Sequence, residues 1–170
     1  MNLIEEKDFQ ILPILVVPDD RLKTKCPKIP NIDTRIQKLA KDMIATMRDA
    51  HGIGLAGPQV GIMLRLIVCE VENQLHVIAN PQLARVEGNE VGTEGCLSIP
   101  GYVGDVERAI KVVVKGKNMK GKDIRIKAEG LLARCFQHEI DHLDGILYTD
   151  KLISPKTFRK RIDSDEVGLE

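Results

Sequence analysis

The segment from Glu129 to Leu143 constrains the fold more than any other part of the sequence, because its pattern fits a helix buried on one side. With ~3.6 residues per turn, its apolar residues and its H-E-x-x-H residues share one arc of about 160°. That arc carries Leu131, Leu132, Cys135, Phe136, His138, Glu139, His142 and Leu143. The opposite side, which we expect to face solvent, carries Arg134, Gln137, Asp141 and Asp144. The polar residues of the arc therefore need partners inside the core, where an unsatisfied polar group is costly.

The rest of the sequence predicts an α+β fold. Apolar residues recur at helical spacing from Asp33 to Ala50, and Asp33 can cap that helix. Runs rich in β-branched residues predict two hairpins, Leu64–Val71 with Leu75–Asn80 and Ala109–Lys115 with Asp123–Lys127. The basic run Lys156–Arg161 predicts a solvated helix face. We therefore expect antiparallel β-sheets packed around a central helix carrying H-E-x-x-H, with an N-terminal helix and a short C-terminal helix.

Length and composition fit one domain that spans residues 1–170, with residues 161–170 as a loose polar tail. The formal net charge is +0, which gives no electrostatic reason to expect a specific nucleic acid or a membrane as partner. No apolar run is long enough to span a bilayer, and Glu5 and Glu6 lie where a secretory signal would carry positive charge. We expect a cytoplasmic protein and a monomer.

On a helix, H-E-x-x-H offers two imidazoles to one metal ion and a carboxylate to a water molecule. A catalytic site of this kind needs a third protein ligand. Cys135 shares the helix face, but it lies about 10 Å along the axis from His142, too far to bind the same ion easily. Cys96, in E-G-C-L-S-I-P, lies in a tight segment flanked by glycine and proline and can supply a thiolate. The alternative for Cys96 is an ordinary buried free cysteine.

Two other patterns suggest chemistry that the sequence does not support. G-I-G-L-A-G, Gly52–Gly57, matches a dinucleotide-binding fingerprint, but it follows a helix pattern and lacks the surrounding βαβ unit. Its glycines are better explained by a close approach of the backbone to a ligand. Ser98 has no G-x-S-x-G elbow around it, and a cysteine–histidine enzyme would explain neither the second histidine nor Glu139.

Three segments together resemble the signatures of the peptide deformylases, in the same order and with similar spacing. They are G-I-G-L-A-G-P-Q-V-G (Gly52–Gly61), E-G-C-L-S-I-P (Glu94–Pro100) and Q-H-E-I-D-H-L-D-G (Gln137–Gly145). The resemblance extends from about Pro18 to Arg161 and is nearest to the bacterial and plant-organelle type. It implies an enzyme that removes the N-formyl group from the initiating methionine of nascent chains, so its partners would be formylmethionyl peptides and, transiently, the ribosome.

The resemblance also implies roles for individual residues. Cys96, His138 and His142 would bind one divalent metal ion, ferrous iron in the first place, with zinc or nickel as substitutes. Glu139 would carry protons. The side chain of Gln59 and the N–H of Leu97 would stabilise the oxyanion, and Gly54 would contact the substrate through its backbone. One position departs from the usual G-x-G-L-A-A pattern, because Gly57 replaces the second alanine.

Further residues are expected around the substrate. The apolar side chains of Ile53, Leu131 and Cys135 suit a methionine side chain, although core packing would explain the same residues. We group Glu94 with them and expect it to pair with Arg108 and brace the cysteine segment. Two alternatives compete with a deformylase: a metallopeptidase of other specificity, and a metal-stabilised binding protein that is not an enzyme. The second has no need of the base that Glu139 provides.

Overall fold

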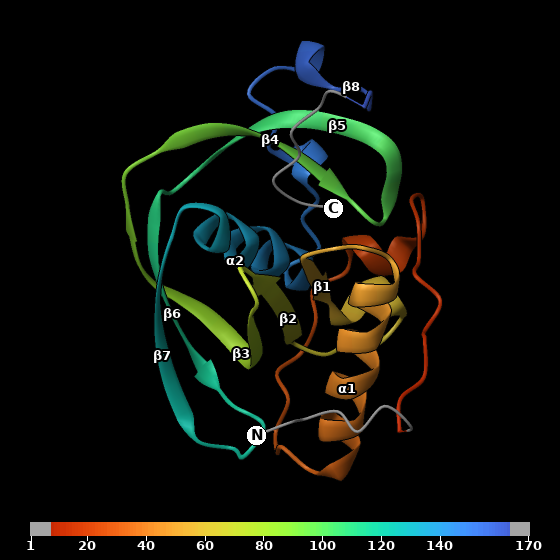
Figure 1. The fold of residues 1–170 in the computed structure, drawn as a ribbon, viewed down its shortest axis with the longest axis vertical. Coiled ribbons are helices and arrows are strands. Elements are labelled where there is room, and N and C mark those ends of the chain that lie inside the picture. The colour runs from red at the N-terminus through yellow and green to blue at the C-terminus, as the bar shows by residue number, and fades with distance from the viewer. Residues whose placement is uncertain (1–7, 164–170) are drawn as a thin grey trace.

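The computed structural model describes residues 8–163, in which two antiparallel sheets and two α-helices are packed together (Figure 1). Glu5, Glu6 and most of the expected polar tail lie outside the described residues. The larger sheet has the order β1-β2-β3-β6-β7 and the smaller one β4-β5-β8. The helices are α1 (Thr34–Asp49) and α2 (Gly130–Leu143). The strands are β1 (Gly54–Ala56), β2 (Leu66–Val71), β3 (Gln74–Glu87), β4 (Glu90–Cys96), β5 (Ile99–Arg108), β6 (Lys111–Lys117), β7 (Asp123–Glu129) and β8 (Arg159–Lys160).

Helix α1 begins where its cap predicts. The carboxylate of Asp33 accepts hydrogen bonds from the backbone N–H groups of Arg35 and Ile36, which otherwise lack partners in the first turn. Its buried face, which includes Met43 and Met47, packs on β1 and β2. Neither helix in the described part of the chain is long and apolar enough to cross a lipid bilayer.

The larger sheet contains both expected hairpins. Glu72 and Asn73, with φ of 53° and 61°, form the two-residue turn between β2 and β3, as a type I′ hairpin requires. β3 continues beyond Asn80 to Glu87, further than the sequence predicts. Pro81 directly follows the predicted end of the strand at Asn80, and it cannot donate a hydrogen bond to a neighbouring strand. The sheet accommodates it with a register shift between Ala79 and Gln82.

The smaller sheet was not predicted as strands. β4 and β5 form a hairpin around Leu97 and Ser98, although the segment contains glycines at 92, 95, 101 and 104. Glycine is depleted in strands, so the segment has the composition of a loop. Gly104 leaves room for Leu152, because a Cβ there would lie 2.3 Å from the end of the Leu152 side chain.

The expected C-terminal helix is absent from the described residues, and this prediction was wrong. After α2 the chain forms single turns of 3-10 helix at Tyr148–Asp150 and Pro155–Thr157 and then the short strand β8. β8 pairs with β5 through Tyr102 opposite Lys160, and the Phe158 ring stacks on the Tyr102 ring at 5.1 Å. The basic run Lys156–Arg161 thus forms the end of a 3-10 turn and a short strand, and not the expected helix face.

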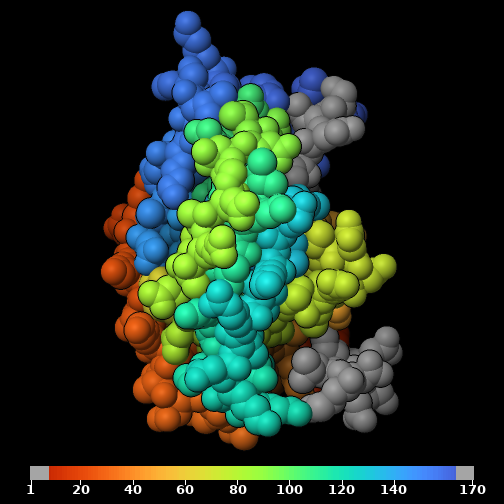
Figure 2. Space-filling view, turned by 90° about the vertical axis from the view of Figure 1, so that its left-hand side faces the viewer, coloured from red at the N-terminus to blue at the C-terminus, as the bar shows by residue number. Residues whose placement is uncertain are grey.

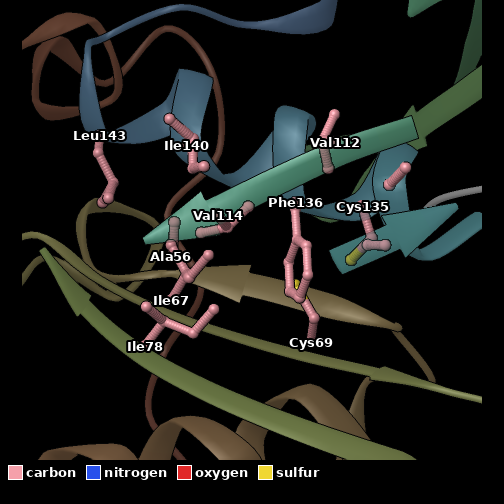
Figure 3. Close-up of a cluster of buried hydrophobic side chains, with 12 residues drawn as sticks. Ala56, Ile67, Cys69, Ile78, Val112, Val114, Cys135, Phe136, Ile140 and Leu143 are labelled. Carbon is pink, nitrogen blue, oxygen red and sulfur yellow. The ribbon is translucent and has the colours of Figure 1, made fainter. Parts of the chain in front are cut away.

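Helix α2 lies between the two sheets and is covered on most sides (Figure 1). One face of the larger sheet, through Ile67, Val112 and Val114, packs against α2 around Phe136 (Figure 3). The other face, through Leu66 and Val68, packs against α1. α1 reaches β1 and β2, whereas β6 and β7 have a helix on the α2 side alone.

Candidate active site

Strand β4 and helix α2 bring together three side chains that can bind a metal ion. Cys96 ends β4, and His138 and His142 lie one turn apart on α2. Their ligand atoms all lie within 4.8 Å of one another, and Cys96 Sγ is 3.4 Å from His142 Nε2. All three side chains are buried. A thiolate and two imidazoles fit one zinc or ferrous ion and leave a coordination position open.

Glu94 orients the first of these histidines. Its Oε1 lies 2.8 Å from His138 Nδ1, which directs His138 Nε2 away from Glu94. A carboxylate that accepts from Nδ1 fixes the tautomer and the ring orientation of a ligating histidine. Glu94 is itself held by Arg108 through two hydrogen bonds of 2.9 Å and by Arg134 at 2.7 Å. The expected pairing of Glu94 with Arg108 is therefore confirmed.

These residues form a buried ion cluster, which we define as Glu94, Arg108, Arg134, His138 and Asp141. Asp141 completes it by accepting from Arg108 at 2.6 Å. Burial alone would raise the pKa of Glu94 strongly, but its bonds to Arg108 and His138 outweigh burial and leave the pKa well below its usual range. Glu94 is 0% exposed and all its partners are protein groups, so the structure places it behind a histidine and not among residues that touch substrate.

The predicted solvent side of α2 was wrong at two positions. Arg134 and Gln137 are buried, because protein atoms satisfy their polar groups. Arg134 also donates to the carbonyl oxygens of Val106 and Glu90, and its guanidinium lies over Gly92, where a Cβ would be 2.9 Å away. Gln137 both donates to and accepts from the backbone of Ala109 at 2.9 Å. The absence of a side chain at Gly92 of β4 makes room for the Arg134 guanidinium.

Glu139 lies beside β1, with its carboxylate next to the backbone of Gly54. A Cβ at Gly54 would be 2.6 Å from Glu139 Oε1, so Gly54 is required for this approach. Glu139 Oε2 is buried and has no hydrogen-bond partner among the described residues. Burial raises the pKa of Glu139 to about 7, and the neighbouring His138 opposes that rise. A carboxyl group in such surroundings can accept and return a proton near neutral pH.

Gln59 presents its amide nitrogen to the same site. Its Oε1 accepts from the backbone N–H of Ala56 at 3.0 Å, which fixes the orientation of the amide. Its Nε2 donates to Ser98 Oγ at 3.2 Å and lies 3.5 Å from Cys96 Sγ. Leu97 lies in the turn between Cys96 and Ser98. Gln59 therefore supplies a fixed donor beside the three metal-binding side chains.

Gly57, the departure from the usual pattern, has a local reason. A Cβ at this position would lie 2.6 Å from the carbonyl oxygen of Leu64 and 2.7 Å from that of Ile62. The loop at Ile62–Leu64 thus occupies the space that the alanine methyl would need. Gln59 remains bonded to Ala56 and Ser98, so the donor geometry is kept.

The three residues expected to surround the methionine side chain, Ile53, Leu131 and Cys135, do not all lie together. Cys135 is 0% exposed, and its thiol donates to the carbonyl oxygen of Ile53 at 3.5 Å, so these two residues lie together beside Gly54. Leu131 is 42% exposed near the start of α2, although the helix pattern predicts it on the buried arc. Their contact with a methionine side chain stays a prediction.

Sequence reasoning missed three partners of the site. Arg134 and Asp141 were assigned to solvent, and Ser98 was considered as a nucleophile but not as an acceptor for Gln59. One signal was present: Glu94 and Asp141 are carboxylates within motif segments, and two carboxylates need cationic partners such as Arg108 and Arg134 if they are buried.

The sequence and the fold are both similar to those of known proteins. A family model described as polypeptide deformylase matches residues 11–158. A peptide deformylase from Symbiobacterium thermophilum is 53% identical over 144 residues, which cover 83% of this chain and 66% of that protein. One from Thermodesulfovibrio yellowstonii is 50% identical over 159 residues, 89% of this chain and 96% of that protein. The crystal structure of a peptide deformylase from Synechococcus elongatus in complex with actinonin has a TM-score of 0.85 at 39% identity, covering 92% of this chain and 88% of that chain.

Proposed function

The chain belongs to the peptide deformylase family, enzymes that remove the N-formyl group from nascent polypeptides, and from this premise we propose which residues do the chemistry. Cys96, His138 and His142 hold one metal ion, and Glu139 moves the proton. The observation that carries this assignment is the convergence of the three ligand atoms within 4.8 Å beside Glu139. The alternatives of a metallopeptidase of other specificity and of a binding protein do not account for the family match.

The proposed reaction uses each residue for one task. A divalent ion at this site supplies Lewis-acid polarisation of the formyl carbonyl and makes a water molecule more acidic. Glu139 accepts the proton of the attacking water and then gives it to the leaving amine. Negative charge that develops on the formyl oxygen is stabilised by the Gln59 amide and the Leu97 N–H. Gly54 contacts the peptide through its backbone.

Several finer assignments belong to the same proposal. We propose ferrous iron as the ion, with zinc or nickel as substitutes, because a thiolate with two imidazoles suits these metals. Thiolate ligation also makes the site sensitive to oxygen. Residues 1–170 form a single catalytic domain, which acts as a monomer in the cytoplasm on formylmethionyl peptides at the ribosome. Ile53, Leu131 and Cys135 line the path of the methionine side chain.

The test measures formate release from a formylmethionyl peptide by protein prepared without oxygen and supplied with ferrous iron. Absence of turnover with iron, nickel and zinc alike would refute the activity. We expect Cys96→Ala to lose the metal, because it removes one of three protein ligands. Cys135→Ala is the matched control: it deletes a buried thiol of α2 that lies outside the ligand set, so it should keep the metal. Equal metal content in both variants would show that Cys96 is not the third ligand.

Glu139→Gln separates proton transfer from metal binding. The amide keeps the shape of the side chain but cannot accept a proton, so turnover should fall by about 10²- to 10⁴-fold. Metal content should stay at the wild-type level, because Glu139 is not among the converging ligands. Loss of metal in this variant would show that the role of Glu139 is misassigned.

A further inference from the structure

The face of β6 and β7 that points away from α2 carries a concentration of positive charge. Val112 and Val114 of β6 and Ala128 of β7 pack toward α2. Because side chains alternate across a strand, Lys115, Arg125 and Lys127 point to the other side. All three are exposed there. β6 and β7 lie on the surface shown in Figure 2, in its teal-to-cyan centre.

Strand register places these cations next to one another. Lys115 lies directly opposite Arg125, and Val113 lies between Arg85 of β3 and Lys127 of β7. We define Arg85, Lys115, Arg125 and Lys127 as the basic sheet face. None of the four forms an ion pair among residues 8–163, whereas Lys117 at the margin pairs with Asp123. Like charges directly opposite each other destabilise a sheet, so this arrangement has a cost.

Acidic residues lie at the two ends of this face, Asp123 beside Lys117 at one end and Glu87 and Glu129 at the other, and not in its middle. Glu87 and Glu129 are both opposite Lys111 in the register and offset its charge. Toward the end at Asp123, an open depression of about 660 Å³ is lined by four cationic side chains, Lys28, Lys115, Lys117 and Arg125, and by one carboxylate, Asp123, which pairs with Lys117. The uncompensated charge is therefore local, although the formal net charge of the whole chain is +0.

The chemistry of the basic sheet face suits a phosphate backbone better than a bilayer or a protein. The exposed apolar residues of β3, Leu83 and Val86, are opposite Val114 and Val112 and so belong to the other face. Val113, on the basic side, is 7% exposed. The face thus offers no apolar anchor for a membrane and no aromatic centre for a protein interface. Cations about 7 Å apart along a strand and about 5 Å apart across strands can contact successive phosphates.

We propose that the basic sheet face contacts the phosphate backbone of RNA. The choice of RNA over other polyanions rests on the proposed function, because nascent polypeptides emerge from a particle built largely of RNA. Contacts of this kind are electrostatic and independent of base sequence, so they are compatible with the expectation that the protein has no specific nucleic-acid partner. They hold the enzyme near its substrate and leave the catalytic residues on the other side of the sheet.

The experiment measures binding of the metal-loaded full chain to a short labelled RNA duplex over a range of salt concentrations. The test variant is Lys115→Gln with Arg125→Gln and Lys127→Gln. The matched control, Arg35→Gln with Lys156→Gln and Lys160→Gln, changes net charge equally at exposed sites elsewhere. We expect the test variant to bind on the order of tenfold more weakly, with a salt slope shallower by about 0.7 to 0.9 for each lost contact. The control should bind like wild type.

A second variant keeps the charge and tests the fold. Lys115→Arg with Arg125→Lys and Lys127→Arg should bind RNA as wild type does, because phosphate contacts need charge and not one side-chain shape. Equal RNA binding by the test and control variants would overturn the proposal. So would tighter binding to vesicles of anionic lipid than to RNA at the same phosphate concentration.

Turnover of a free formylmethionyl peptide separates this proposal from the catalytic one. All three surface variants should release formate at the wild-type rate, since none of these residues belongs to the site. RNA binding without any turnover in wild type would refute the catalytic proposal while the contact stands. Turnover in wild type, together with RNA binding that is unchanged by the substitutions on the basic sheet face, would refute the RNA contact while the catalytic proposal stands.

Discussion

The buried ion cluster and the basic sheet face are both rich in arginine or lysine, but they treat charge in opposite ways. In the cluster, Glu94 is 0% exposed and each guanidinium has a carboxylate partner. On the sheet, Lys115 and Arg125 lie opposite each other with no carboxylate between them. Buried charge is tolerated only with partners, whereas exposed charge is solvated by water and can stay unpaired. The paired charges of the cluster therefore position residues of the site, whereas the unpaired charges of the sheet face are free to contact an anionic partner.

Removing the central charge of the cluster should have the largest effect on stability. In Glu94→Gln, Arg108 and Arg134 keep their charges but lose the carboxylate that compensates them. We expect a loss of about 3–5 kcal/mol in the free energy of unfolding, measured by urea denaturation. Metal affinity should fall by about 10- to 100-fold, because His138 loses the partner that orients it.

Glu107→Gln is the matched control for that change. Glu107 is an exposed carboxylate on the same strand, β5, as Arg108, and its loss should alter stability by no more than about 0.5 kcal/mol. Equal losses of stability in Glu94→Gln and Glu107→Gln would show that the buried carboxylate contributes no more to stability than the exposed one.

A change of shape without a change of charge should have an intermediate effect. Arg108 donates to Glu94 through two nitrogens and to Asp141 through a third, a geometry that a lysine ammonium cannot reproduce. We expect Arg108→Lys to cost about 2 kcal/mol, since it loses hydrogen bonds between charged groups. Arg125→Lys on the basic sheet face should be nearly neutral. Unfolding midpoints of the two variants test this directly, and similar costs would contradict the comparison.

The smallest expected effect has the opposite sign. Lys115→Thr removes one of two like charges that face each other across β6 and β7, so it should stabilise the protein by about 0.2–1 kcal/mol. The gain should shrink at high salt, which screens exposed charges. Threonine also favours strands, so the charge contribution needs a double-mutant cycle with Arg125→Thr. A coupling energy of zero at low salt would show that the two cations do not repel each other.

The sequence predicts those parts of the fold whose signal is local. Helical spacing identifies α1 and α2, and the runs of β-branched residues identify the hairpin of β2 and β3. β4 and β5 escape prediction because their glycines have tertiary reasons: Gly92 leaves room for Arg134, and Gly104 leaves room for Leu152. The composition of a strand then reflects its neighbours in space, which a single sequence does not display.

The site divides in the same way. His138, Glu139 and His142 follow from one helical face, whereas Cys96 joins them through a fold that brings β4 to α2. Arg134 and Gln137 were assigned to solvent because polarity was equated with exposure, and their partners lie on other elements. The basic sheet face is hidden in sequence because its cations alternate with apolar residues on separate strands.

The distance along the chain between Cys96 and His142 has a consequence for chain entropy. These two residues are 46 positions apart and approach to 3.4 Å, so a metal ion bound by both closes a long loop. If it were a permanent cross-link, a loop of that length would lower the entropy of the unfolded chain by an amount worth about 4 kcal/mol. An ion bound by both residues would therefore also join the smaller sheet to the central helix, and its removal would release that link.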